Sequence, residues 1–339
     1  MRGEGDKQLC RSAMPSLHEF IEGILGGDRG LLSRAITLVE SSRVEHETLA
    51  QQLLEQLHPH CGRSLRIGIT GAPGVGKSCL IDALGNYLLD RETSRLAVLA
   101  IDPTSAISGG SILGDKTRMQ RLITKDRVFI RPSPSSGHLG GVAHRTREAM
   151  MLCEAAGYTI VIVETVGVGQ SEFAVRAMVD FFLLLSVACA SDELQGIKRG
   201  IIELADAIVI TKADGDNLIH APQAQQAFEN ALQTISSPTE NWQVPVQICS
   251  AINNDGIDEL WQTVERQYDS TKGSGAFHRR RQQQAVDWMH TLIKDRIQRF
   301  MNRDPNLSNL LKSLEQSVRA GTLTSRAAAE ELCNAGGWL

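Results

Sequence analysis

The chain has 339 residues, of which 42% are hydrophobic and 22% charged, so it can bury a sizeable core and is not intrinsically disordered. A formal net charge of −4 argues against a general nucleic-acid binder. We expect a cytoplasmic protein with reduced thiols and no membrane contact, because the seven cysteines form no C-x-x-C pair and neither a secretory signal nor a membrane-spanning stretch is visible.

Helical spacing fills the first 63 residues. Apolar side chains recur at intervals of three and four, as at Leu17, Phe20 and Ile24, and such spacing forms one apolar stripe on a helix. Pro59 and Gly62 end this zone, since both residues stop a helix. The sequence therefore predicts an N-terminal helical extension over residues 1–63.

Residues 64–270 alternate apolar runs with helical segments. Several runs lack polar alternation, as at 160–163, which is typical of strands buried on both faces of a mostly parallel sheet. We predict a three-layer α/β domain over 64–270. Its expected strands are 65–70, 96–102, 127–131, 159–164, 180–187, 206–211 and 245–250.

The last segment, 271–339, returns to helical spacing. Residues 271–275 are rich in Gly and Ser and form a plausible hinge. A long helix is expected from about 277 to 302, followed by shorter ones near 307–319 and 323–334. We therefore predict a C-terminal helical arm over 271–339.

A phosphate-binding motif follows the first predicted strand. Residues 71–78 read G-x-x-x-x-G-K-S, between the strand 65–70 and an amphipathic helix. Its glycines let backbone N–H groups turn toward an anion, and the helix N-terminus adds its own N–H groups. Lys77 can reach the β- and γ-phosphates of a nucleotide, and the hydroxyl of Ser78 can ligate magnesium. The predicted nucleotide contacts are Gly71, Ala72, Pro73, Gly74, Val75, Gly76, Lys77, Ser78 and Cys79.

Two carboxylates end predicted strands beside this loop. Asp102 closes the strand 96–102, and Glu164 closes the strand 159–164. Ligands of open α/β sheets bind at the carboxyl ends of the strands, and Mg²⁺ prefers oxygen ligands. We expect Ser78, Asp102 and Glu164 to hold Mg²⁺ directly or through water; the alternative is that either acid caps the following helix.

The sequence also indicates which base the nucleotide carries. Thr211-Lys212-Ala213-Asp214 follows the strand 206–211 and is close to the N-K-x-D element of GTPases, with Thr in place of Asn. Asp214 can accept hydrogen bonds from the ring N–H and exocyclic amine of guanine, a donor pair that adenine lacks, and Lys212 can lie along the base. Ser250 and Ala251 follow another strand, where a guanine-contacting S-A element is expected. The site is therefore predicted to select GTP, although an ordinary helix cap at Asp214 is the alternative.

Longer stretches of the chain resemble a known family. They are residues 100–105, 109–119, 163–172 and 194–200. With the motifs above, these stretches resemble the methylmalonyl-CoA mutase-associated GTPases, the MeaB/ArgK/MMAA group of SIMIBI-class P-loop GTPases. The resemblance extends from the N-terminal helices to the C-terminal arm.

The resemblance implies roles for further residues. Asp102 and Asp115 would belong to the first switch region and the metal or nucleotide pocket. Glu164 and Gly167 would form the E-x-x-G element, in which the Gly167 N–H senses the γ-phosphate. Gln170, in the second switch, would orient water.

A third switch is implied by residues 191–200. This segment, with Lys198, resembles the loop that relays the nucleotide state to a partner protein. Two positions depart from the family pattern: Thr211 replaces Asn, which removes a loop-tying amide, and Ser191 stands where Gly is common.

The function implied by the resemblance is that of a GTP-hydrolysing chaperone. Such a protein binds a cobalamin-dependent acyl-CoA mutase, methylmalonyl-CoA mutase by default, and gates cofactor loading, protection and reactivation. GTP or GDP and Mg²⁺ are the expected cofactors, adenosylcobalamin enters only through the mutase, and the arm implies a homodimer. Two alternatives stay open: an ATP-dependent kinase or ATPase linked to amino-acid transport, and a binding switch with negligible turnover.

Overall fold

The computed structural model describes residues 14–41, 43–91, 94–102, 119–134, 139–165, 171–188, 199–235 and 237–338. The chain forms two compact units, Met1–Arg279 and Arg280–Leu339. The first unit holds the sheet and every residue of the motifs named above. The expected division into 1–63, 64–270 and 271–339 remains a prediction about domains.

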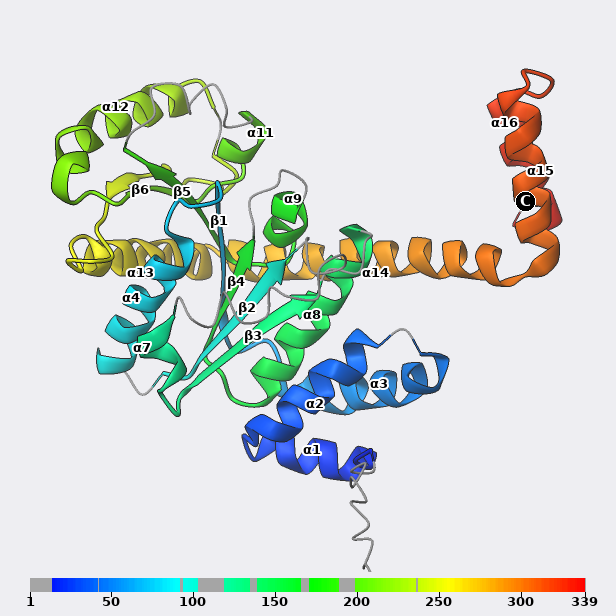
Figure 1. The fold of residues 1–339 in the computed structure, drawn as a ribbon, viewed down its shortest axis with the longest axis horizontal. Coiled ribbons are helices and arrows are strands. Elements are labelled where there is room, and N and C mark those ends of the chain that lie inside the picture. The colour runs from blue at the N-terminus through cyan, green and yellow to red at the C-terminus, as the bar shows by residue number, and fades with distance from the viewer. Residues whose placement is uncertain are drawn as a thin grey trace, which may run out of the picture. The chain divides into compact units, whose positions relative to one another are not determined.

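A single seven-stranded parallel sheet organises the first unit (Figure 1), in the order β3-β2-β4-β1-β5-β6-β7. Its register brings Glu164 beside Ile69 and Thr211 beside Val187. Because all strands run the same way, their carboxyl ends meet at one edge. The strands are β1 Leu65–Gly71, β2 Leu96–Asp102, β3 Val128–Pro134, β4 Ile160–Thr165, β5 Phe181–Val187, β6 Ala207–Thr211 and β7 Val246–Ile248.

Helices cover both faces of this sheet (Figure 1). Residues of β2 alternate between the two sides: Leu96 and Val98 pack with one set of helices, Ala97 and Leu99 with the other. On the first side lie α4 Lys77–Arg91, α7 Gln120–Ile123 and α13 Ile257–Gly273. On the second side lie α8 Leu139–Ala155 and α9 Ser171–Arg176. Beside β6 and β7 lie α11 Arg199–Ile202, the 3₁₀ turn η2 Gly215–Ile219 and α12 Ala221–Leu232.

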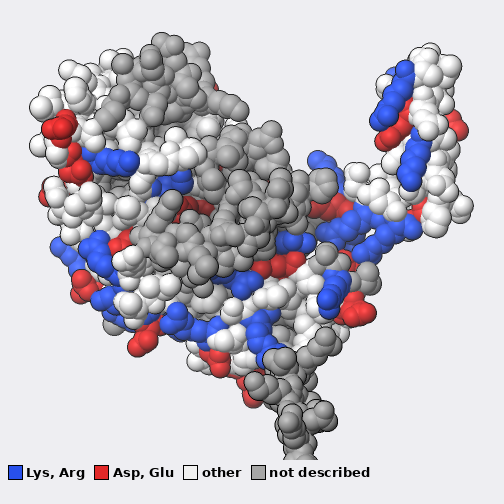
Figure 2. Space-filling view, in the orientation of Figure 1, with Lys and Arg blue, Asp and Glu red and all other residues white. Residues whose placement is uncertain are grey.

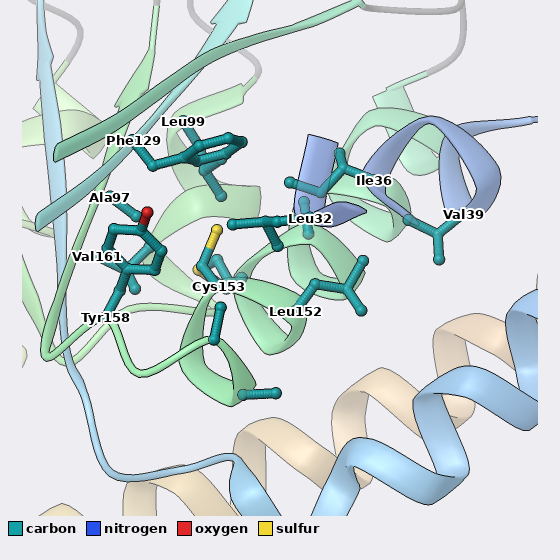
Figure 3. Close-up of a cluster of buried hydrophobic side chains, with 14 of the residues drawn as sticks. Leu32, Ile36, Val39, Ala97, Leu99, Phe129, Leu152, Cys153, Tyr158 and Val161 are labelled. Atoms are coloured by element: carbon teal, nitrogen blue, oxygen red, sulfur yellow. The ribbon is translucent and has the colours of Figure 1, made fainter. Parts of the chain in front are cut away.

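The N-terminal helices pack onto the outside of α8 and share its core (Figure 3). Leu32 and Ile36 meet Leu152 and Cys153 of α8, and this cluster continues to the sheet at Phe129. These helices are α1 Leu17–Leu25, α2 Arg29–Glu40 and α3 Val44–Leu57, followed by the 3₁₀ turn η1 His58–His60. The N-terminal segment is thus part of the same buried core as the sheet.

The C-terminal unit is helical. It contains the part of α14 (Ala276–Arg303) beyond residue 279, α15 (Pro305–Arg319) and α16 (Ser325–Ala335). Leu307, Leu314 and Ala328 are buried where α15 and α16 pack together. α14 also carries apolar side chains that are exposed: Val286, Met289, Ile293, Ile297 and Phe300.

The predicted fold class, an α/β P-loop domain with helical extensions at both ends, is confirmed. Within the described part of the chain, no helix combines the length and apolarity that crossing a bilayer requires. Lys and Arg residues are interspersed with Asp and Glu over the visible described surface of the first unit (Figure 2).

Candidate functional site

The phosphate-loop motif forms the turn between β1 and α4. Gly71 has φ +153°, and a Cβ there would lie 2.6 Å from the carbonyl oxygen of Leu185 on the neighbouring strand, so only glycine fits. Gly76 has φ +100° and leads directly into α4, which begins at Lys77. The motif thus ends at the N-terminus of α4, and a helix N-terminus attracts anions through its first N–H groups and its dipole.

The side chain of Lys77 is hydrogen-bonded to the backbone of this loop. Its side chain is largely buried, and its Nζ donates to the carbonyl oxygens of Gly71 at 2.8 Å and Ala72 at 3.1 Å. The ammonium group is therefore fixed by the loop's own backbone before any anion arrives. A buried, hydrogen-bonded cation next to a helix N-terminus suits the phosphates of a nucleotide.

Ser78 and Glu164 meet at the same edge. The hydroxyl of Ser78 donates to Oε1 of Glu164 at 3.2 Å, although the two residues are 86 positions apart. Both side chains are buried, and Thr165 next to Glu164 donates to the hydroxyl of Thr70 at 2.7 Å. These bonds fix the ends of β4 and β1 against each other. The result is a pair of hard oxygen ligands beside the phosphate loop, the donor type that suits Mg²⁺.

Thr211 connects the predicted base-recognition loop, residues 211–214 (the base loop), to the phosphate loop. Its Oγ1 lies 2.6 Å from the carbonyl oxygen of Val75 and 3.0 Å from that of Ser186. Thr211 lacks the side-chain amide that Asn would use to connect the loops at this position. Its hydroxyl makes a connection instead. This contact was not predicted, because no local pattern places residues 75 and 211 together.

Lys212 continues this connection. It has φ +55°, an uncommon conformation for a non-glycine residue, and its aliphatic stem runs beside Gly76. The closest stem carbon, Cε, would lie 3.8 Å from a Cβ placed on Gly76. Lys212 therefore spans from the base loop to the phosphate loop, as a side chain lying along a bound base would do.

The two predicted base contacts, Asp214 and Ser250, are hydrogen-bonded to each other. The hydroxyl of Ser250 donates to Oδ2 of Asp214 at 2.6 Å and accepts from the N–H of Asn253 at 3.2 Å. The backbone N–H of Ala213 also donates to the carbonyl of Cys249 at 3.2 Å. Ala251 follows in the same turn, so both base elements form one bonded unit.

The remaining predicted site residues lie outside what the structure describes. They are Asp115, Gly167, Gln170 and Lys198, and for Asp102 only the backbone, at the end of β2, is described. In the described ranges, no group of three or more His, Cys, Asp or Glu side chains is arranged to hold a metal ion. The oxygen pair of Ser78 and Glu164 is a different kind of site, because it contains a hydroxyl.

The phosphate loop lies at the carboxyl edge of a parallel sheet, and Thr211 joins it to the loop that carries Asp214, whose carboxylate suits guanine. This chain is a P-loop GTPase. Residues 32–306 match the family described as Methylmalonyl Co-A mutase-associated GTPase MeaB, and the chain belongs to that family. GTP and GDP are accordingly its nucleotides.

Relatives of this chain cover most of its length. The Probable GTPase Rv1496 of Mycobacterium tuberculosis is 50% identical over 309 residues, which are 91% of this chain and 92% of that protein. The mouse Methylmalonic aciduria type A homolog, mitochondrial, is 44% identical and aligns with 92% of this chain and 78% of its own length. A solved structure titled LAO/AO transport system kinase is 38% identical, with a TM-score of 0.76 over 94% of this chain and 96% of that one.

Proposed function

We propose that this GTPase is a chaperone of a cobalamin-dependent acyl-CoA mutase, methylmalonyl-CoA mutase in the first instance. It gates the loading of adenosylcobalamin onto the mutase, protects the mutase and reactivates it. The single observation that carries the proposal is the family match over residues 32–306, whose description names the mutase. Adenosylcobalamin reaches this chain only through its partner.

Different residues of the site would bind the phosphates and the base of GTP. Lys77 and the N–H groups at the start of α4 bind the β- and γ-phosphates and offset their charge. Asp214, oriented by Ser250, accepts from guanine, while Lys212 and Ala251 flank the base. Catalysis then consists of positioning a water against the γ-phosphate and stabilising the charge that develops on it.

Mg²⁺ fits the oxygen ligands of this site. Ser78 and Glu164 present a hydroxyl and a carboxylate within 3.2 Å of each other beside the phosphate loop. We assign them, with Asp102 and Asp115, as the residues that would hold the ion directly or through water. When bound, Mg²⁺ offsets the negative charge of the phosphates.

Three further residues complete the proposed catalytic and switching groups. Gly167 would sense the γ-phosphate through its N–H, Gln170 would orient the attacking water, and Lys198 would relay the nucleotide state to the mutase. All three assignments come from the family resemblance and their place in the sequence.

A homodimer is part of the proposal. The exposed apolar residues Val286, Met289, Ile293, Ile297 and Phe300 recur on α14 at spacings of three and four, and they therefore form one stripe on that helix. A second copy of the chain would cover this stripe.

A second candidate function comes from the name of one solved relative, a LAO/AO transport system kinase. An ATP-dependent kinase linked to amino-acid transport would need an adenine site, whereas Asp214 presents a carboxylate that matches the donor pair of guanine. The two candidates therefore differ in the base that they turn over.

The test is a hydrolysis assay with GTP and with ATP, in the presence and absence of methylmalonyl-CoA mutase from the same organism. GTP-selective turnover that the mutase accelerates markedly supports the chaperone. Slow GTP turnover that is indifferent to the mutase rejects this partner but keeps the GTPase. ATP turnover as fast as GTP turnover rejects the base assignment and favours the kinase.

A further inference from the structure

Two short helices, α9 and α11, lie in the chain segments between β4 and β5 and between β5 and β6, respectively. α9 (Ser171–Arg176) comes six residues after Thr165, at the end of the strand that carries Glu164. α11 (Arg199–Ile202) precedes β6, the strand that ends in Thr211. The two helices are thus attached to the phosphate side and the base side of the site, respectively.

The C-terminal end of α9 is hydrogen-bonded to the residue that precedes β6. Arg176, the last residue of α9, makes two hydrogen bonds to the carboxylate of Asp206 at 2.6 and 3.2 Å. Asp206 is fully buried just before β6, and its carboxylate also accepts from the N–H of Phe182 at 2.9 Å. A buried ion pair with further hydrogen bonds does not adjust easily, because breaking it leaves a charge unpaired.

The inner face of α9 is equally fixed. A Cβ on Gly68 of β1 would lie 2.8 Å from Cγ1 of Val175, so α9 sits on the strand with no room for a side chain between them. Val175 is fully buried at this contact. α9 therefore has a rigid inner face and a rigid C-terminal end.

The N-terminal parts of α9 and α11 are in contact through an apolar ring and not through an ion pair. Phe173 is 55% exposed, and Cζ of its ring lies 3.4 Å from the position that a Cβ on Gly200 would take. The ring therefore lies beside Gly200 at the start of α11, at van der Waals distance from the place of a Cβ. This contact is shallow, apolar and exposed, in contrast to the buried bond between Arg176 and Asp206.

We propose that Phe173 is a positioning residue for GTP hydrolysis. Its ring, resting on Gly200, sets the spacing between α9 and α11 at their site-facing ends, and thereby aligns the Glu164 side of the site with the Thr211 side. This role rests on the assignment of Glu164 to the phosphate site, and it does not depend on the identity of the partner protein.

A double-mutant cycle on kcat tests this role. Phe173→Ala removes the ring, and Gly200→Val adds a branched side chain that extends beyond the Cβ position, which already lies 3.4 Å from the ring; the φ of Gly200 lies outside the region that side chains avoid, so the backbone accepts valine. We expect each single change to lower kcat by about threefold to tenfold, with KM within about twofold. In the Phe173→Ala background, Gly200→Val should then cost less than about twofold, because the ring it would displace is absent.

The controls separate positioning from general destabilisation. Leu25→Ala removes an apolar side chain of α1 that is 41% exposed, and it should leave kcat unchanged. Phe173→Leu keeps an apolar contact and should recover much of the lost kcat. Equal effects of Gly200→Val in both backgrounds, or a folded Phe173→Ala protein with normal kcat, would overturn the role. Glu164→Gln is measured in parallel: normal turnover in that variant would remove the site assignment, whatever the cycle shows.

Discussion

The hydroxyl of Thr211 lies 2.6 Å from the carbonyl oxygen of Val75, which joins the base-recognition loop to the middle of the phosphate loop. A hydroxyl has one proton to donate, so the carbonyl of Ser186, at 3.0 Å, is its weaker acceptor. Thr211 and Val75 are both buried. A hydrogen bond that is shielded from water therefore joins the two halves of the proposed nucleotide site.

Thr211→Val should weaken nucleotide binding while keeping the shape of the side chain. The change leaves the buried carbonyl of Val75 without its donor, which costs about 1–2 kcal/mol, or roughly fivefold to thirtyfold in the Kd for GDP. Thr211→Ser keeps the hydroxyl and should restore most of the affinity. Titration calorimetry with GDP measures both variants.

A matched control for this change is Thr234→Val. The hydroxyl of Thr234 donates only to the local carbonyl of Ala231, in an exposed turn after α12. GDP affinity should be unchanged in this variant. Equal losses at positions 211 and 234, or no loss at 211, would contradict the importance of the contact with Val75.

Asp214→Asn should change which base the site prefers. The carboxylate matches the two donors of guanine, whereas an amide turns one donor toward them; we expect the Kd for GDP to rise by about 100-fold or more. Xanthosine diphosphate carries a carbonyl in place of the exocyclic amine and should gain affinity. Competition binding with both nucleotides measures the switch, and Asp255→Asn, an exposed acid in the adjacent turn, is the control. A parallel loss for both bases would argue against base contact by Asp214.

Much of this fold was predictable because its signals are local. The apolar run at 65–70 and the phosphate motif after it are contiguous in sequence, and β1 was expected within one residue of its observed end. β3 was expected to end at 131 but continues to Pro134, since an edge strand paired only with β2 tolerates proline. β7 is shorter than expected, because Ser250 turns away to pair with Asp255.

The contacts that assemble the site were less predictable. Thr211 with Val75, and Arg176 with Asp206, join residues far apart in the chain. Their partners are a backbone carbonyl and a buried carboxylate, and neither leaves a periodic pattern. The sequence predicts Asp214 and Ser250 as base contacts, whereas the bond between them follows from the sheet order.

Lys77→Ala should abolish tight nucleotide binding without unfolding the protein. Nζ of Lys77 donates to the loop carbonyls of Gly71 and Ala72 at 2.8 and 3.1 Å, and water can replace it at these carbonyls. Losing its charge-assisted bonds to the phosphates should raise the Kd for GTP by roughly 100-fold. Fluorescent-nucleotide binding and thermal unfolding check the two parts, with Lys272→Ala as an exposed-lysine control. A folded Lys77→Ala protein that still binds GTP tightly would refute the role of this lysine.

Glu154 should make the fold sensitive to acid. Burial alone would raise the pKa of Glu154, but Arg66, and then Ser64 and the N–H of Gly62, outweigh it and hold that pKa below its ordinary value of 4.5. A carboxyl whose pKa is lower in the folded state stabilises the fold above its unfolded pKa. That stabilisation is lost as the pH falls through the folded pKa.

Glu154→Gln tests this acid sensitivity. At pH 7 the change leaves Arg66 as a buried charge without its partner, which should cost about 3–5 kcal/mol of unfolding free energy. Between about pH 5 and pH 3 the variant should lose less further stability than the wild type. Denaturant unfolding across this range measures both slopes, with the exposed Glu22→Gln as control. Parallel slopes for wild type and Glu154→Gln would show that another group titrates.

Cys79 should report on nucleotide binding through its reactivity. Its side chain is exposed in the first turn of α4, directly after Ser78. Cys153 and Cys249 are buried; burial raises the pKa of Cys249 to about 12 and also raises that of Cys153, so both thiols stay protonated at pH 8. Iodoacetamide should therefore label Cys79 and leave the other two unmodified, as read by peptide mass mapping.

Saturating GDP should slow this labelling several-fold, because the phosphates would occupy the space beside the first turn of α4. Cys333 in α16 is partly exposed and belongs to the other compact unit, so its labelling is the internal reference for a general effect of GDP. In Lys77→Ala the protection of Cys79 should disappear at the same GDP concentration. Labelling of Cys79 that GDP does not slow in the wild type, or that slows equally at Cys333, would place the nucleotide elsewhere.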